Sequence, residues 1–174
     1  AASLGVAQQA FGITGALVIN VKDYPYNAVG DGTADDTSAI QAALNTGKAV
    51  VIPQTSSYYK VTSSLTMSGA EQALLILGRV KLVTASTSTD LLVASGAHQR
   101  IHGSGILEGP GVYKDNTVGV GIASLIRIQG KGSTVEGIEL REPVESGVTL
   151  DTVDSCSVRS VRIVGGIGAY GSSQ

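Results

Sequence analysis

Apolar residues in the second half of the chain recur with a nearly constant internal spacing. Leu65, Met67, Leu75 and Val80 define a first unit, with steps of 2, 8 and 5 along the chain. The same steps separate Leu91, Val93, Ile101 and Ile106. They recur in Ile126, Ile128, Val135 and Leu140, where the step of 8 is shortened to 7, and in Val148, Leu150, Val158 and Ile163. Self-similar spacing of this kind is typical of a repeat architecture.

Each unit is built from short segments in which apolar residues occupy every second or third place, as in "TVEGIEL" (134–140) and "SVRSVRI" (157–163). No helical period fits these segments. Three short strands in about 23 residues predict one turn of a parallel β-helix, whose turns stack at the strand spacing of ~4.8 Å. A β-sandwich is the alternative, but hairpins have no reason to keep the same gaps from unit to unit. We therefore predict an all-β solenoid.

One short helix is predicted before the strands begin. The segment "DDTSAIQAALNTG" (35–47) places Ile40, Ala43 and Leu44 on one face, with Asp35 or Asp36 as N-cap and Gly47 as the stop. A β-helix must cover its end turns, because they expose apolar side chains and free strand edges. We expect this helix, about residues 36–46, to cap the first turn. After Ile163 no comparable helix follows, so we expect the last turn to be covered by further turns or by neighbouring subunits.

Composition and charge exclude several classes of partner. The formal charge is −2, and the 12 Lys and Arg residues form no basic run, so nucleic acid is not an expected partner. No apolar run approaches the ~20 residues that cross a bilayer, so no membrane insertion is expected. The single Cys156 is expected to be a small buried hydrophobic residue.

The segment that leads into the repeat resembles part of a known superfamily. The segments "INVKDY" (19–24) and "AVGDGTADDTSAIQAALNTGKAVVIPQTSSYYKVTSSLTM" (28–67) are similar to the first part of the pectate-lyase-like right-handed parallel β-helices, most of all those of bacteriophage tailspikes and capsule depolymerases. The intervening "PYN" (25–27) departs from the superfamily pattern. The resemblance implies that residues 20–174 are the N-terminal capping segment and the first turns of a right-handed parallel β-helix domain. It also implies that residues 1–19 are a connector left from a particle-anchoring region.

The resemblance further implies a function. A tailspike-type protein lies in the virion tail and acts at the host cell surface, where it recognises a bacterial surface polysaccharide and, in the full-length protein, cleaves its glycosidic bonds. It would be a homotrimer that contacts other virion proteins through its N-terminus. The alternatives are a non-catalytic virion adhesin and a secreted bacterial or fungal polysaccharide lyase or glycosidase. The chain begins at Ala1, so we expect a fragment whose cleavage residues lie further along.

Candidate site residues are few. Glycoside cleavage needs two carboxyl groups about 5–9 Å apart, and the alignment of the second and third units relates Glu108 to Glu142, unless both are ordinary surface residues. Tyr113, in the inserted segment 109–121, is the natural exposed aromatic for binding a sugar. The cluster Asp31, Asp35 and Asp36 suits a hard cation in principle, but starting the helix is the favoured role.

Metal and cofactor sites are not expected. His98 and His102 lie on a strand rather than on one face of a helix, so they do not form a zinc motif. Other charged residues fit ion pairs between turns, and the repeat register pairs Glu139 with Arg162 and Glu136 with Arg159.

Overall fold

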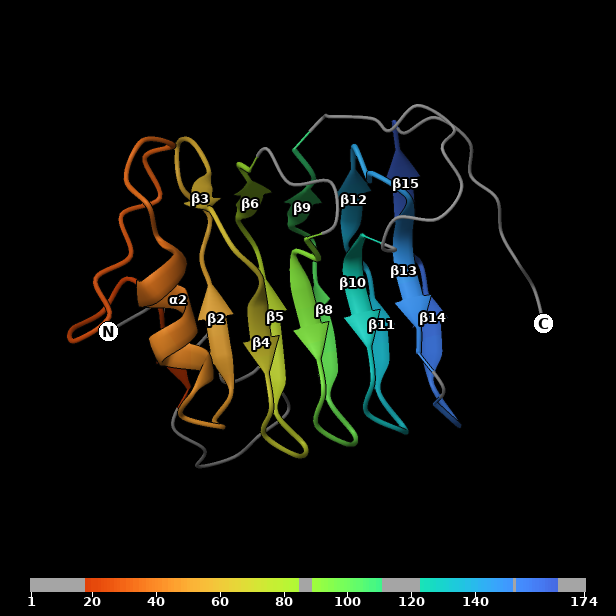
Figure 1. Cartoon of the computed structure of the whole chain (residues 1–174). Coiled ribbons are helices and arrows are strands. Elements are labelled where there is room, and N and C mark those ends of the chain that lie inside the picture. The colour runs from red at the N-terminus through yellow and green to blue at the C-terminus, as the bar shows by residue number, and fades with distance from the viewer. Residues whose placement is uncertain (1–17, 85–88, 111–122, 152, 166–174) are drawn as a thin grey trace.

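The computed structural model describes residues 18–84, 89–110, 123–151 and 153–165 (Figure 1). Within these ranges the protein is all-β with one short helix, α2 (Thr37–Leu44), so the predicted all-β content and the predicted short helix are confirmed. In the same ranges no helix has the length and apolar character that crossing a membrane requires.

The strands form three parallel sheets. Sheet A contains β1 (Ile19–Asn20), β2 (Val50–Ile52), β5 (Ala73–Ile76), β8 (Arg100–Gly103), β11 (Thr134–Glu136) and β14 (Ser157–Arg159). Sheet B contains β3 (Tyr59–Val61), β6 (Arg79–Leu82), β9 (Ile106–Glu108), β12 (Glu139–Arg141) and β15 (Arg162–Val164). Sheet C contains β4 (Leu65–Met67), β7 (Leu92–Ala94), β10 (Ser124–Ile128) and β13 (Ser146–Leu150).

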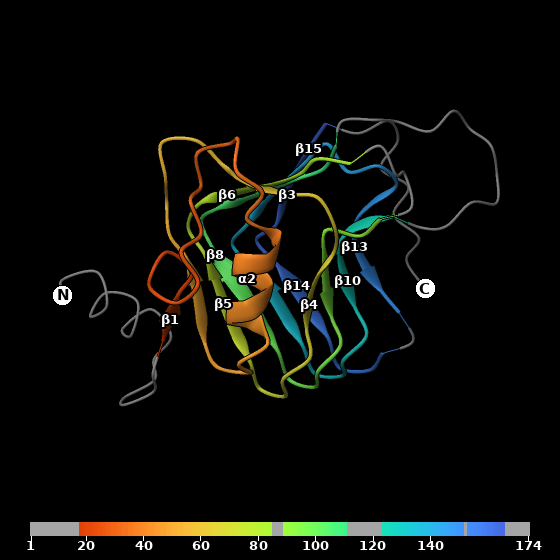
Figure 2. The ribbon, with the colours of Figure 1, turned by 60° about the vertical axis from the view of Figure 1, so that its left-hand side comes forward.

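From β2 onward the chain visits the three sheets in turn, and every sheet keeps its strands in chain order (Figures 1 and 2). A repeat unit is therefore three successive strands, one in each sheet, such as β2, β3 and β4. Each strand pairs in parallel with its equivalent in the next unit, as β3 does with β6. The backbone N–H and C=O groups of each strand therefore form their hydrogen bonds with the strands of neighbouring units, and not within hairpins.

The predicted repeat register is correct from the third unit to the fourth, whereas from the second unit to the third it is correct in sheet A and wrong by one position in sheets B and C. Ile126 pairs with Val148, Val135 with Val158 and Leu140 with Ile163, as the predicted alignment of these units requires. The first alignment is wrong by one position, because Leu65 pairs with Leu92 rather than Leu91, and Val80 with Leu107 rather than Ile106. A one-residue slip moves a side chain to the other face of a sheet. Leu75, predicted inside, accordingly lies in a second buried cluster on the outer side of sheet A.

The main core lies between the three sheets and is made of stacked apolar residues. In sheet B the inward row runs Tyr59, Val80, Leu107 and Leu140, all buried to 1% exposure or less. The row ends at Ile163, which is 50% exposed, and the corresponding last residues of sheets A and C, Val158 and Leu150, are 42% and 48% exposed. The inward side chains of the last unit are therefore accessible in this structure.

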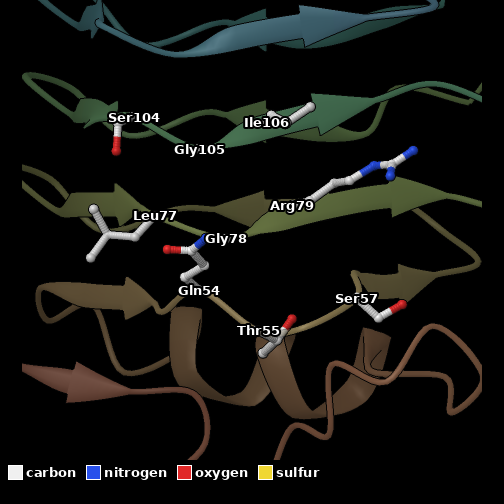
Figure 3. A pocket seen from close by; sticks show the side chains of 9 residues that line it. All are labelled: Gln54, Thr55, Ser57, Leu77, Gly78, Arg79, Ser104, Gly105 and Ile106. Carbon is white, nitrogen blue, oxygen red and sulfur yellow. The ribbon is translucent and has the colours of Figure 1, made fainter.

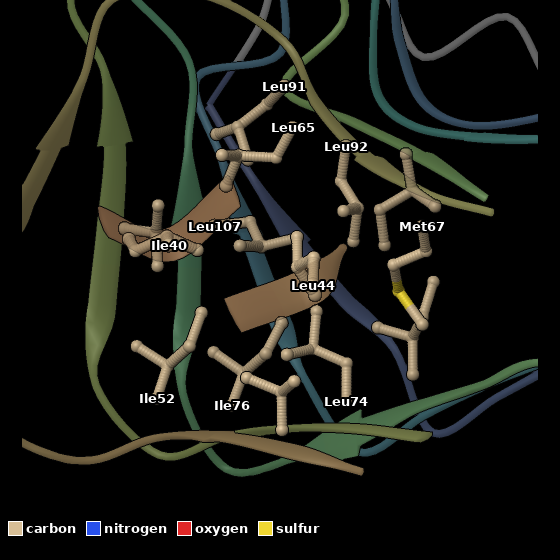
Figure 4. Close-up of a cluster of buried hydrophobic side chains, with 14 of the residues drawn as sticks. Ile40, Leu44, Ile52, Leu65, Met67, Leu74, Ile76, Leu91, Leu92 and Leu107 are labelled. Carbon is tan, nitrogen blue, oxygen red and sulfur yellow. The ribbon is translucent and has the colours of Figure 1, made fainter. Parts of the chain in front are cut away.

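Helix α2 covers the opposite end of this core. Its Ile40, Ala43 and Leu44 are buried, as the sequence predicts, and Figure 4 shows Ile40 and Leu44 among core residues of several strands. In Figure 2 the helix lies over the end of the space between the sheets. Gln41 also closes the free edge of β4: its Nε2 donates to the Thr66 carbonyl at 2.9 Å, and its Oε1 accepts from the Thr66 amide at 2.8 Å.

The first described residues join the edge of sheet A. Val18 is buried, and Ile19 belongs to β1, which pairs with β2 at the edge of sheet A. Residues 1–17 of the expected connector lie outside the described residues. Cys156 is partly buried and packs against the main core.

Candidate functional site

The outer side of sheet B carries a charged surface. Alternate residues of each strand point away from the core, and the parallel register aligns them in two rows across the strands. One row contains Arg79, Ile106, Glu139 and Arg162, and the other contains Lys60, Lys81, Glu108 and Arg141. These eight residues are called the sheet-B face below.

Glu108 is the centre of the tightest charge cluster on this face. Its side chain is only 7% exposed and forms ion pairs with Arg79 and, at 2.9 Å, with Lys81. Arg79 Nε donates to the Glu108 carboxylate at 2.6 Å. Burial alone would raise the pKa of Glu108, but the hydrogen bonds from Lys81 and Arg79 outweigh it and hold the pKa below its usual value. Glu108 is therefore ionised at neutral pH.

Glu139, on the neighbouring strand, is the second carboxylate of the sheet-B face. Arg141 Nε donates to it, and Arg162 Nη1 donates to it at 3.3 Å. These contacts, the one from Arg141 first, lower the pKa of Glu139. The predicted pairing of Glu139 with Arg162 is confirmed, and the register places Glu136 opposite Arg159 as predicted.

An aromatic ring lies beside the cluster. Tyr58 directly precedes β3, and the charged groups of Arg79 and Lys81 lie 5.5 and 5.8 Å from the centre of its ring. Both separations are within the range of a cation–π contact. Exposed or half-exposed aromatic rings are the side chains against which sugar rings pack in binding sites. Tyr58 is therefore a candidate sugar-binding residue.

A pocket of about 400 Å³ adjoins this surface where sheet A turns into sheet B (Figure 3). Its lining comes from the corresponding connections of three units, 53–58, 77–78 and 104–105, and from the first residues of β6 and β9. Gly78 and Gly105 are stacked in its floor, and a Cβ on either would collide with a backbone carbonyl of the preceding unit. The close approach of successive turns of backbone therefore requires glycine here and leaves the floor open.

The predicted relation between Glu108 and Glu142 is corrected by the register. Arg141, not Glu142, lies opposite Glu108, so the predicted alignment of these strands is wrong by one position. Glu142 follows β12 with a positive φ of 49°, and its amide donates to the Val164 carbonyl at 2.9 Å. The two candidates are thus not at equivalent places on adjacent strands. Their catalytic roles stay predictions, and Tyr113 lies outside the described residues.

The aspartates before α2 make structural contacts. Asp36 is buried and accepts hydrogen bonds from the amides of Val29 and Gly30, so it holds the preceding loop rather than capping the helix with its side chain. Asp35 accepts from Thr37 and from the Thr62 hydroxyl, which ties the start of the helix to the end of β3. Hydrogen bonds from Ala34 and Thr33 lower the pKa of Asp31, and those from Thr37 and Thr62 lower that of Asp35.

Metal-ligating clusters are absent from the described residues, in which no three His, Cys, Asp or Glu side chains gather around a common point. His102 lies on β8, and burial lowers its pKa, so its imidazole is neutral at pH 7. His98 lies in the preceding connection, where it has a positive φ of 56°.

Sequence reasoning missed Glu139 as a functional candidate, along with Tyr58 and the pocket. Glu139 is the register partner of Ile106, which lies two positions before Glu108 on the same outer side of β9. With ~4.8 Å between strands and ~3.3 Å per residue, the Cα atoms of Glu108 and Glu139 are about 8 Å apart. Aligning Glu108 with position 141 instead of 142 would have identified this pair in the sequence.

Comparison with known proteins finds a similar fold in one solved structure. No protein-family model matches the sequence, and no curated protein matches it. Among solved structures, a protein from Parabacteroides merdae described as a "putative glycosyl hydrolase" is similar in fold, with a TM-score of 0.58 and 15% sequence identity. The similarity covers 84% of this chain and 80% of that one. At this identity the similarity concerns the fold, and the all-parallel β structure agrees with it.

Proposed function

We propose that the chain is part of a right-handed parallel β-helix protein that binds a polysaccharide along the sheet-B face and, in the intact protein, cleaves its glycosidic bonds. The observation that carries this proposal is the position of two outward carboxylates, Glu108 and Glu139, beside a pocket and an aromatic ring. The fold similarity to a "putative glycosyl hydrolase" supports a carbohydrate-active role. The resemblance of residues 19–67 to the β-helix superfamily supports the handedness.

The carboxylate pair suits glycoside chemistry in its spacing. Inverting enzymes keep their two carboxyl groups about 6.5–9.5 Å apart and retaining enzymes about 5–5.5 Å apart, and the ~8 Å between the two Cα atoms lets the carboxyl groups reach either range. One of the pair must be protonated to act as the acid. Glu108 is suited to that change, because a substrate that drew Arg79 and Lys81 away would leave burial as the dominant influence and raise the pKa of Glu108.

The test is cleavage of purified bacterial capsular polysaccharides, measured as new reducing ends. Glu139→Gln and Glu108→Gln are each expected to reduce turnover at least a hundredfold with binding retained. Glu71→Gln is the matched control, since Glu71 is exposed in the connection between β4 and β5. Undiminished turnover in both site variants would refute the assignment of the pair.

A non-catalytic adhesin is the second candidate, and the ion pairs favour it. Both carboxylates are held ionised by arginine or lysine partners, which is the state of a binding surface rather than of a general acid. For this candidate, a polysaccharide would bind and release no product, and Glu108→Gln would change affinity alone. A secreted lyase would instead release unsaturated products that absorb ultraviolet light.

The tailspike assignment is proposed on the resemblance. It includes a homotrimer, a virion tail location, action on a bacterial surface polysaccharide and contact with other virion proteins through the N-terminal residues. Molar mass by light scattering tests the assembly state: a trimer supports this proposal, and a monomer at micromolar concentration in the intact protein contradicts it.

A further inference from the structure

The pocket beside the sheet-B face has the lining of a sugar site. Its volume of about 400 Å³ falls in the lower part of the range of small-molecule sites, roughly 300–1,000 Å³. The lining includes four polar but uncharged side chains, those of Gln54, Thr55, Ser57 and Ser104. It also includes two apolar side chains, those of Leu77 and Ile106. Amide and hydroxyl groups suit the hydroxyls of a sugar, and aliphatic side chains suit its C–H face.

The charge of the lining points to a neutral sugar. No acidic side chain contributes to it, and Arg79 is the one charged contributor among the described residues. Arg79 is already engaged by the Glu108 carboxylate, and Figure 3 shows its side chain extending away from Gly78 and Gln54. A carboxylate on a bound sugar would have to compete with Glu108 for this cation, which costs affinity.

Thr55 has an unused hydrogen-bonding group in this pocket. Its hydroxyl oxygen is buried and has no hydrogen-bond partner within the described part of the chain. Figure 3 shows that oxygen on the side of Thr55 that faces Gly78 and Arg79. A buried hydroxyl without a partner is unfavourable, and a sugar hydroxyl in the pocket would satisfy it once rotation of the Thr55 side chain brings the oxygen to the pocket wall.

We propose that the pocket is a subsite for one neutral sugar unit, and that the Thr55 hydroxyl is a specificity-determining contact of it. The inference rests on the proposed function in that the sugar unit belongs to the same polysaccharide. Ile106 links the two regions, since it lines the pocket, pairs with Glu139 and lies two positions before Glu108. The sugar unit next to the pocket therefore lies over the two carboxylates.

The experiment is a titration of the 174-residue chain, followed by amide resonances in NMR. The probes are D-glucose, D-galactose and N-acetyl-D-glucosamine, with D-glucuronate as the charged comparison. At least one neutral sugar is expected to shift the backbone amides of Gly78 and Gly105 and the side-chain amide of Gln54. Shifts with D-glucuronate alone, or with none of the four, would overturn the proposal.

Three variants sharpen this titration. Thr55→Val removes the hydroxyl but keeps the shape of the side chain, and it is expected to weaken sugar binding about five- to tenfold, the effect of one lost hydrogen bond. Its Tm should not fall, because the hydroxyl has no partner to lose among the described residues. Ser104→Trp, at an exposed position, should fill the pocket and abolish the shifts. Ser68→Ala, in the connection between β4 and β5, is the matched control and should leave sugar binding unchanged.

The outcome separates this inference from the proposed function. If capsular polysaccharide still binds Ser104→Trp as it binds the wild type, the subsite is refuted and the sheet-B face stays a polysaccharide site. If neutral sugars shift the pocket amides but no polysaccharide binds or is cleaved, the subsite is supported and the proposed function fails. Unchanged sugar affinity in Thr55→Val would refute the role of its hydroxyl.

Discussion

Replacing Glu108 by glutamine tests the charge cluster of the sheet-B face most directly. The carboxylate is 7% exposed and has two cationic partners, whereas Arg79 and Lys81 are 36% and 30% exposed and can regain water. Hydrogen bonds to charged groups contribute about 1.5–3 kcal/mol each. Glutamine keeps one acceptor oxygen but turns its amide group toward a cation. We therefore expect Glu108→Gln to lower the free energy of unfolding by about 1–3 kcal/mol.

Thermal and urea unfolding followed by circular dichroism measure this loss. At about 3 °C per kcal/mol for a domain of this size, the Tm should fall by about 3–9 °C. The pKa of Glu108 in the folded protein is below the ordinary value of 4.5. The ionised carboxylate therefore makes its full contribution to the free energy of unfolding above pH 4.5, and this contribution is lost as the pH falls through the pKa of the folded state. The difference from wild type should thus be constant from about pH 7 to pH 5 and shrink below pH 4.5.

Glu71→Gln provides the baseline for an exposed glutamate and should change the free energy of unfolding by less than about 0.5 kcal/mol. Two results would refute the reasoning about Glu108. One is a loss no larger than that of Glu71→Gln, and the other is a difference from wild type that persists undiminished at pH 3.

Three further predictions concern the fold, and urea unfolding measures each of them. Gln41→Ala removes both hydrogen bonds to the edge of β4 and should lower the free energy of unfolding by about 1–2 kcal/mol. An unchanged free energy of unfolding would contradict this role of Gln41. Gly30→Ala should cost about 1–3 kcal/mol, because φ is +67° and the new Cβ would lie 2.8 Å from Thr55 Cγ2. Its control is Gly47→Ala, which has a similar φ of +68° but open space around the new Cβ, and which should cost only about 1 kcal/mol. Leu140→Ala should cost about 2–5 kcal/mol, but Ile163→Ala, in the same row and half exposed, less than about 1 kcal/mol; equal losses would contradict the described burial.

The helix and the strand content could be predicted because local rules determine them. In α2 the apolar positions 40, 43 and 44 follow the helical period, and Gly47 has the positive φ that ends a helix. The role of Asp36 could not be read in the same way. Its carboxylate binds the amides of Val29 and Gly30, which requires the loop to fold back on the helix.

The register of the units was predictable only in part, because apolar spacing alone does not separate inward from outward residues where both faces of a sheet are buried. Leu74 and Leu75 are both buried, one in each hydrophobic cluster, and either fits an apolar pattern. The offset between partners is also one position smaller from β9 to β12 than from β7 to β10, so one number cannot describe a whole unit. This single position replaced the expected Glu108 and Glu142 pair by Glu108 and Arg141.

The corrected register makes the ion pairs of the sheet-B face informative about function. The pair of Glu139 with the exposed Arg162 is a surface ion pair that contributes little to stability, unlike the buried Glu108 cluster, so the fold alone gives no strong reason for it. A polymer that crosses the strands meets an equivalent outward position every ~4.8 Å, and the proposed polysaccharide would pass from the pocket over Ile106 to Glu139. Under the proposed function, binding and cleavage would depend on different residues. A filled pocket should weaken both, whereas Glu139→Gln should stop cleavage and leave the polysaccharide bound.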